Sequence, residues 1–198
     1  MYSILKRIFD VVLSVIVLLV LSPLFIIIAI LIVVDSRGGV FYKQIRVGKD
    51  GTEFGLLKFR SMTTDSDKAS QITIGNDSRI TKVGHFIRKY KIDEFPQLIN
   101  IIIGDMSVVG PRPEVPKYVK MYDVSQRLVL QVKPGLTDFA TVEYFDEQRL
   151  LGESESPHET YIKEIMPAKL ELNKKYIVER SFGTDLKIIM QTILKIVR

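Results

Sequence analysis

The chain has 198 residues, a formal net charge of +5 and no cysteine. The length suits one domain with a single core, and the absence of cysteine excludes disulfides, thiolate catalysis and cysteine-based zinc sites. With only two histidines, His85 and His158, a histidine triad or a multi-histidine metal site is not expected. A covalent catalyst of this composition would use a carboxylate, hydroxyl or lysine, and a bound metal would prefer oxygen ligands, as Mg²⁺ does.

An uncharged apolar run covers residues 11–34. As a straight helix it would rise roughly 36 Å, against a hydrocarbon core of about 30 Å. Ser22 and Pro23 stand at its midpoint, where proline removes a helical hydrogen bond and a serine hydroxyl can satisfy a freed backbone group. Because both flanks are basic, a spanning helix would leave one flank on the wrong side of the positive-inside rule. A re-entrant helix-break-helix is therefore favoured over a plain transmembrane anchor.

The basic flanks of this segment include Lys6, Arg7 and Arg37. We expect these side chains to meet lipid phosphates at the membrane interface. The chain then divides into a re-entrant membrane hairpin, residues 1–36, and a cytoplasmic globular domain, residues 37–198.

The globular part is predicted to be of the α+β class, mostly helical with a small β-hairpin. Two strand-like segments, residues 40–48 and 53–62, flank a turn that contains Asp50-Gly51. The polar segment 65–81 is expected to be a mobile loop and a candidate lid, and residues 133–137 a turn. Helices are expected over residues 82–91, 93–103, 114–132, 167–181 and 184–198.

The last expected helix is amphipathic. Leu186, Ile189, Ile193 and Ile196 share one face, and lysines occupy the other. Such a helix usually packs on a core, but beside a membrane hairpin it can lie along the bilayer surface instead. The whole pattern is typical of a monotopic membrane protein with amphipathic interfacial helices.

Asp93 and Glu94 are adjacent carboxylates at the expected start of helix 93–103. The simplest interpretation is a helix cap, with Asp93 at or near the N-cap and Pro96 in the first turn. The alternative is a site. Successive helical residues point about 100° apart, so the two carboxylates can take separate tasks. A helix dipole would keep Asp93 ionised, which suits a nucleophile or a Mg²⁺ ligand.

Several cations accompany these carboxylates. Lys58 and Arg60 alternate with apolar residues as on a half-buried strand, Arg88 lies in an expected helix, and Arg112 stands between two prolines. Each alone suits an ordinary surface cation. Together with the two carboxylates and Asp105 they suggest a diphosphate site with a metal, because arginine holds phosphate in a fixed fork and Mg²⁺ neutralises a leaving phosphate.

The motifs "KFR", "DEFPQLIN", "GDMSVVGPRP" and "KPGLT" occur in order, after "KRIFDVVLS" and "LSPLF" in the apolar segment. Through them the chain resembles the bacterial sugar transferases, the small monotopic polyprenol-phosphate phosphoglycosyl transferases, over roughly residues 4–137. These motifs are long and specific.

The resemblance implies a two-step transfer. A carboxylate attacks the β-phosphate of a UDP-sugar, UMP leaves, and polyprenol (undecaprenyl) phosphate then takes the phosphosugar in the first membrane step of surface glycan assembly. Carried over by position, Asp93 would be the nucleophile and Glu94 the Mg²⁺ ligand. Lys58, Arg88 and Arg112 would bind phosphate, together with Arg60 of the same motif. Ser22-Pro23 would be the break of the re-entrant helix.

After Pro134 the sequence departs from the family pattern. Asp138 stands where the family usually has glycine, and the chain has no tryptophan. The family often has an aspartate three residues before a tyrosine. At that offset from Tyr161 this chain has His158, next to Glu159, and whether either takes that role stays open. By analogy with the short members we expect an acetamido or amino-deoxy donor sugar.

Two other classes compete with this reading. A membrane-associated glycosyltransferase would release UDP without a covalent carboxylate, and a non-enzymatic membrane scaffold would need Asp93 and Glu94 only as helix caps. A nucleic-acid partner is not expected, because no nucleic-acid motif accompanies the positive charge. The expected location is the bacterial inner membrane, with the catalytic domain on the cytoplasmic face. A homodimer is compatible with the sequence, and no residue requires it.

Overall fold

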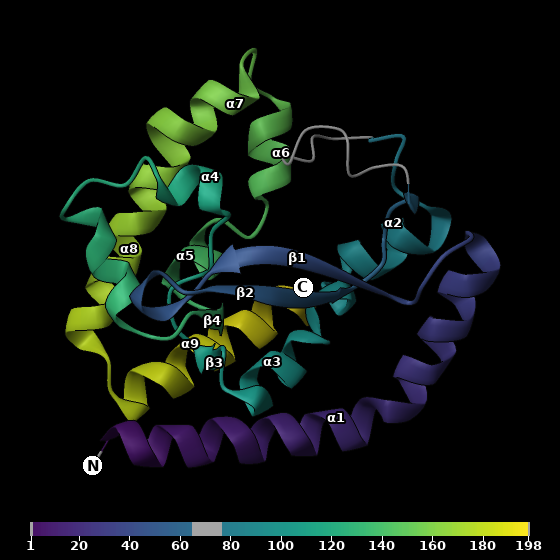
Figure 1. The fold of residues 1–198 in the computed structure, drawn as a ribbon, viewed down its shortest axis with the longest axis horizontal. Helices are drawn as coiled ribbons and strands as arrows, with labels where there is room; N and C mark the ends of the chain where they lie inside the picture. Colours follow the sequence, from purple (N-terminus) through teal and green to yellow (C-terminus); the bar gives the residue numbers. More distant parts are fainter. Residues whose placement is uncertain (1, 65–76, 198) are drawn as a thin grey trace.

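The computed structural model describes residues 2–64 and 77–197 (Figure 1). The predicted α+β class is confirmed: helices predominate, and the strands form two small sheets. Residues 65–76 of the expected lid lie outside the described residues. The principal helices are α1 (Tyr2–Asp35), α2 (Lys82–Lys89), α3 (Gln97–Ile103), α8 (Met166–Glu179) and α9 (Phe182–Val197). Shorter helices are α4 (Pro116–Val119), α5 (Phe139–Glu143), α6 (Glu147–Gly152) and α7 (Pro157–Thr160).

Helix α1 is, within the described part of the chain, the one helix long and apolar enough to cross a membrane, and only 11% of its most apolar 18-residue window is buried. The helix is continuous, with Pro23 inside it, and it bends along its length (Figure 1). Proline has no N–H to offer the carbonyl of Leu19, four residues earlier. The Ser22 hydroxyl donates to that same oxygen over 2.8 Å, as the sequence predicted for a tolerated break.

The basic residues before the apolar run have partners within the protein, and the expectation that they meet lipid phosphates stays a prediction. Lys6 donates to the buried carboxylate of Asp185 on α9 over 2.9 Å. The Arg7 guanidinium donates to the carbonyls of Ile101 and Ile102 over 2.5 and 2.9 Å. A buried carboxylate needs a charged partner, and the last carbonyls of α3 lack helical partners. These cations therefore fasten α1 to the globular domain.

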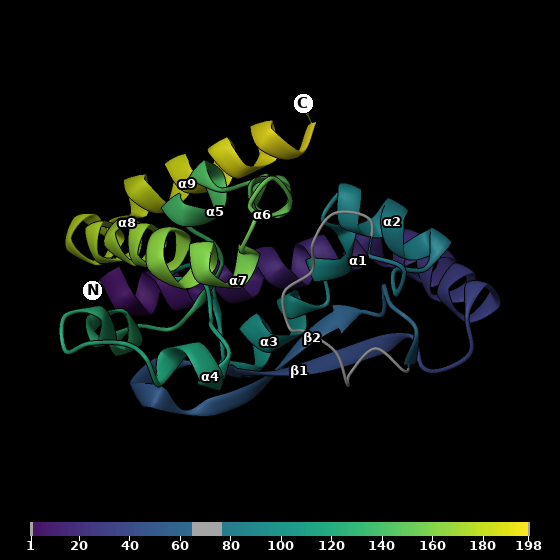
Figure 2. The ribbon, with the colours of Figure 1, turned by 90° about the horizontal axis from the view of Figure 1, so that it is seen from above.

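The predicted β-hairpin is confirmed. Strands β1 (Phe41–Val47) and β2 (Glu53–Phe59) pair antiparallel, with Phe41 opposite Phe59. Asp50 and Gly51 take positive φ angles of 57° and 78° in the turn, a conformation that an Asp-Gly pair supplies at low cost. The hairpin forms one edge of the molecule, opposite α9 (Figure 2).

A second sheet was not predicted. Residues 133–137 were expected to be only a turn, yet β4 (Gly135–Thr137) pairs in parallel with β3 (Ser107–Val109). A Cβ atom on Gly135 would lie 2.1 Å from the backbone nitrogen of Gly110, so only glycine permits this approach. The sheet brings the segment that carries Arg112 beside the start of α5.

Two further helix predictions need correction. The expected helix 114–132 is limited to α4 and a 3₁₀ segment, Gln126–Gln131. Helix α9 is confirmed, but its buried side contains Asp185 and Ile188, whereas Leu186 and Ile193 from the predicted apolar face are largely exposed. Asp185 turns inward because the Tyr176 and Tyr2 hydroxyls and Lys6 bond to it. The face opposite this polar cluster thus stays apolar and unburied.

Candidate active site

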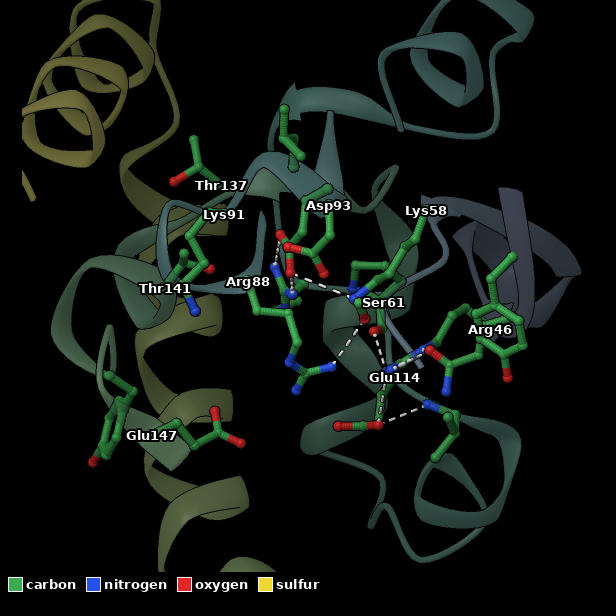
Figure 3. Close-up of a pocket in the computed structure, with 18 of the residues that line it drawn as sticks. Arg46, Lys58, Ser61, Arg88, Lys91, Asp93, Glu114, Thr137, Thr141 and Glu147 are labelled. Atoms are coloured by element: carbon green, nitrogen blue, oxygen red, sulfur yellow. Dashed lines mark hydrogen bonds and ion pairs between the residues drawn. The ribbon is translucent and has the colours of Figure 1, made fainter. Parts of the chain in front are cut away.

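A cavity of about 1050 Å³ opens between the β1–β2 hairpin and helices α5, α8 and α9. Asp93 and Glu94 line it together with Lys58, Arg60, Arg88 and Arg112, so the structure brings together the carboxylates and all four cations that the sequence singled out. Figure 3 labels Asp93, Lys58 and Arg88 among them. The cavity is large enough for a nucleotide-sized substrate.

The two carboxylates lie in a 3₁₀ turn, Ile92–Glu94, and not at the N-cap of α3. The N-cap of α3 is Pro96, and no capping hydrogen bond comes from Asp93. The predicted cap is therefore wrong. The helix begins only after the proline, and Asp93 and Glu94 of the preceding tight turn line the cavity. Figure 3 shows Asp93 there.

Glu94 is held by two cations. The Arg112 guanidinium donates to both carboxylate oxygens, to Oε2 over 3.1 Å, and the Lys58 ammonium lies 3.4 Å from Oε1. Burial by itself would raise the pKa of Glu94, but the charges of Arg112 and Lys58 outweigh it and hold the pKa well below its usual range. The same pair raises the pKa of Arg112. Glu94 therefore stays ionised and fixed in place.

Asp93 differs from its neighbour. Its exposed fraction is 5%, and none of the described residues donates a hydrogen bond to its carboxylate. Burial raises the pKa of Asp93, the charge of Lys58 opposes that shift, and the charge of Glu94 adds to it. Asp93 does not lie at the start of α3, so the dipole of that helix is not what sets its pKa; burial is the largest influence. A buried carboxylate without donors is poorly stabilised as an anion, which favours reaction with an electrophile.

The remaining cations have different surroundings. Burial lowers the pKa of Lys58, against the attraction of Glu94 and Asp93. Arg88 lies 3.4 Å from the Ser61 hydroxyl and lines the cavity. Within residues 2–64 and 77–197 neither side chain has acceptors for all of its N–H groups, so both can meet an added anion.

Arg60 lines the cavity as well, but its guanidinium has protein acceptors, so we expect it to position α1 and not to bind phosphate. Its guanidinium donates to Gly39 O, to Ser36 Oγ and O, to Arg37 O and, at 3.5 Å, to Ile32 O. All five N–H groups are thus occupied at the carboxyl end of α1. The side chain fixes the membrane helix to the hairpin.

Several neighbours of the site were missed from the sequence. Glu114 accepts from Arg46 over 3.2 Å and from the Tyr161 hydroxyl, and Arg46 also reaches the Pro113 carbonyl over 3.0 Å. This network immobilises the chain beside Arg112. A signal was available, because Glu114 directly follows the proline-arginine-proline motif.

Asp138, which stands where the family usually has glycine, also has a structural role that the sequence did not reveal. One carboxylate oxygen accepts from the backbone N–H of Arg112 over 3.2 Å, and the other caps α5 by accepting from Thr141 N over 2.6 Å. Asp138 therefore ties the Arg112 segment to α5. By contrast, Asp105, His158 and Glu159 do not line the cavity.

The chain belongs to the bacterial sugar transferase family, whose family model matches residues 1–198. It is 38% identical over 195 residues to the UDP-glucose:undecaprenyl-phosphate glucose-1-phosphate transferase of Klebsiella pneumoniae, covering 96% of this chain and 39% of that protein. It is 36% identical over 196 residues to the UDP-N-acetylgalactosamine-undecaprenyl-phosphate N-acetylgalactosaminephosphotransferase of Aeromonas hydrophila, covering 97% and 43%. This chain thus spans about two-fifths of either protein.

A relative of similar length is the sugar transferase EpsL of Bacillus subtilis, which is 35% identical over 193 residues. That match covers 98% of this chain and 87% of the relative. The likeness therefore extends from the membrane helix through the divergent segment after Pro134.

Proposed function

We propose that this protein transfers a sugar-1-phosphate from a UDP-sugar to a polyprenol phosphate, through a covalent intermediate on Asp93. The observation that carries the proposal is the contrast between the two carboxylates. The negative charge of Glu94 is balanced by the positive charges of Arg112 and Lys58. Asp93, by contrast, is buried, lacks hydrogen-bond donors among the described residues and faces the same cavity. The names of relatives that act on UDP-sugars and undecaprenyl phosphate support the substrate class.

In the first step an oxygen of Asp93 attacks the β-phosphorus of the UDP-sugar. The bond from that phosphorus to the bridging oxygen breaks, and UMP leaves with the oxygen and its electron pair. Lys58 and Arg88 stabilise the charge that develops on the diphosphate. Arg112, stiffened by its flanking prolines and by Asp138, holds Glu94 beside the nucleophile.

In the second step an oxygen of the polyprenol phosphate attacks the same phosphorus. The bond to Asp93 breaks, the carboxylate is regenerated and a polyprenol diphosphate sugar leaves. No proton moves in either step if both nucleophiles are ionised. Two steps let one site serve a soluble donor and a membrane-bound acceptor in turn.

The carboxylate of Glu94 fits the role of one protein ligand to Mg²⁺. Oε1 accepts from Arg112 and Lys58, whereas in the described part of the chain Oε2 accepts from Arg112 alone and keeps a lone pair. Mg²⁺ is commonly held by one or two carboxylates, waters and substrate phosphates. Glu94 is thus the residue that would hold it, and a bound Mg²⁺ would neutralise charge on the diphosphate.

The membrane part of the proposal follows from α1. We propose a monotopic arrangement in which α1 enters and leaves the cytoplasmic face of the bacterial inner membrane, with the bend at Ser22-Pro23 inside the bilayer. The chain has no natural cysteine, so Ser3→Cys gives a single labelling site. Labelling of Ser3→Cys from the cytoplasmic side supports the arrangement, and labelling only from the opposite side contradicts it.

The nucleotide released tests the reaction. The purified protein is incubated with polyprenol phosphate, Mg²⁺ and a panel of UDP-sugars that includes acetamido, amino-deoxy and plain hexoses. We expect the released nucleotide to be UMP and its release to stop when a metal chelator is added. Turnover should be fastest with an acetamido or amino-deoxy sugar. UDP release would instead identify an ordinary glycosyltransferase, and full activity in Asp93→Asn would overturn the covalent route.

A further inference from the structure

One wall of the cavity is apolar and continues to the outside of the molecule. Ile189, Ile193 and Ile196 of α9 line the cavity that holds Asp93. Ile193 is nevertheless 48% exposed, and the next residue, Leu194, is 55% exposed. Ile193 therefore belongs both to the nucleophile's cavity and to the exposed apolar face of α9.

Lys91 stands on the same side of the cavity. It lines the cavity two residues before Asp93, and its ammonium lies 5.2 Å from the ring centre of Phe145. Figure 3 draws it beside Thr137 and Thr141, across from Arg46. No carboxylate pairs with it among the described residues. A cation over an aromatic ring is partly desolvated and remains available to an anion.

The backbone of Lys91 is also unusual. Its φ angle is 56°, in the left-handed region that a lysine adopts at a cost of about 1–2 kcal/mol. Such strain persists where the surrounding structure enforces it, and it is concentrated at functional sites. Here the conformation closes the turn that presents both Lys91 and Asp93 to the cavity.

We propose that this wall is the binding site of the acceptor, with its phosphate on Lys91 and its first isoprene units along Ile189, Ile193 and Ile196. This inference rests on the proposed function. Lys58 and Arg112 are already engaged by Glu94 and serve the donor. A cation beside the nucleophile, joined to an apolar surface that opens outward, matches a phosphate with a hydrocarbon tail. A UDP-sugar carries no such tail.

The two half-reactions separate this inference from the proposed function. Release of UMP without acceptor reports the donor step, and transfer from the loaded enzyme reports the acceptor step. Ile193→Ser is compared with Leu194→Ser, a neighbour on the same helix that is equally exposed but does not line the cavity. Lys91→Ala is compared with Lys89→Ala on α2. Helical content by circular dichroism checks that each variant folds.

We expect Ile193→Ser to raise the KM for polyprenol phosphate roughly four- to fifteenfold, the factor that corresponds to the loss of one or two methylene contacts. Lys91→Ala should raise the KM for polyprenol phosphate by at least the same factor. Ile193→Ser should keep UMP release near the native rate, whereas Lys91→Ala is judged by its acceptor KM alone, because the charge of Lys91 also acts on Asp93. Leu194→Ser and Lys89→Ala should resemble the native protein in both half-reactions.

Equal acceptor KM values for Ile193→Ser and Leu194→Ser would overturn the inference. Phosphatidic acid carries a phosphate on a different hydrocarbon and serves as a competitor in the acceptor step. Equal inhibition of the native protein and of Ile193→Ser by this lipid would also overturn the inference. Absence of UMP release by the native protein without acceptor would instead contradict the proposed function. The failures of the two claims are therefore distinguishable.

Discussion

Replacing Arg60 tests whether this residue fastens α1 or binds phosphate. Its guanidinium makes five contacts with acceptors in residues 32–39, and a lysine ammonium has only three N–H groups. Arg60→Lys therefore loses about two charge-assisted hydrogen bonds at a partly buried helix end. At roughly 1.5 kcal/mol each, the loss is about 3 kcal/mol. For a domain of this size that corresponds to a fall in Tm of roughly 6–12 °C.

The assay is thermal unfolding in lipid nanodiscs, followed by circular dichroism because the chain has no tryptophan. Arg37→Lys is the matched control, since the Arg37 side chain is exposed and makes no hydrogen bond among the described contacts. Below its Tm, Arg60→Lys should keep the native KM for the donor. A Tm unchanged within 2 °C (roughly the effect of a surface substitution), together with a tenfold higher donor KM, would refute the reasoning and restore Arg60 as a phosphate ligand.

Three more outcomes follow from the structure. Because the charge of Lys58 lowers the pKa of Asp93, Lys58→Met should shift the acidic limb of the UMP-release pH profile to higher pH; an unshifted limb would exclude Asp93 as the titrating group. Gly135→Ala should lower the free energy of unfolding by about 3 kcal/mol, because its Cβ would meet the backbone of the neighbouring strand; chemical denaturation measures this. Pro23→Ala should straighten α1 and move the label on Ser3→Cys to the opposite side of the membrane, and unchanged labelling would show that proline does not set the topology.

Local chemistry made some features predictable. The Asp50-Gly51 pair specified the hairpin turn, because both residues accept positive φ. Ser22 beside Pro23 specified how the helix satisfies the Leu19 carbonyl, for which proline has no N–H to donate. The candidate site was likewise recognisable, since Asp93 and Glu94 fall in one motif and their cations in others. These inferences needed only neighbours in sequence or long ordered motifs.

The features that could not be predicted from the sequence depend on tertiary contacts. Arg60 looked equivalent to Lys58, two residues earlier on the same strand face, but β2 ends at Phe59 and the chain then turns Arg60 toward α1. The strands β3 and β4 have three residues each and are too short to show a period. The raised pKa of Asp93 comes from burial, which depends on the assembled cavity. Sequence spacing carries none of this information.

The central claim is that Asp93 becomes covalently phosphoglycosylated. The direct measurement is the intact mass of the protein after incubation with the UDP-sugar it turns over, without acceptor, followed by mapping of the modified peptide. We predict a mass increase of one sugar phosphate on the peptide that contains Asp93, lost when polyprenol phosphate is added and absent in Asp93→Asn. An unmodified protein that still turns over with both substrates, or an adduct on another residue, would contradict the account.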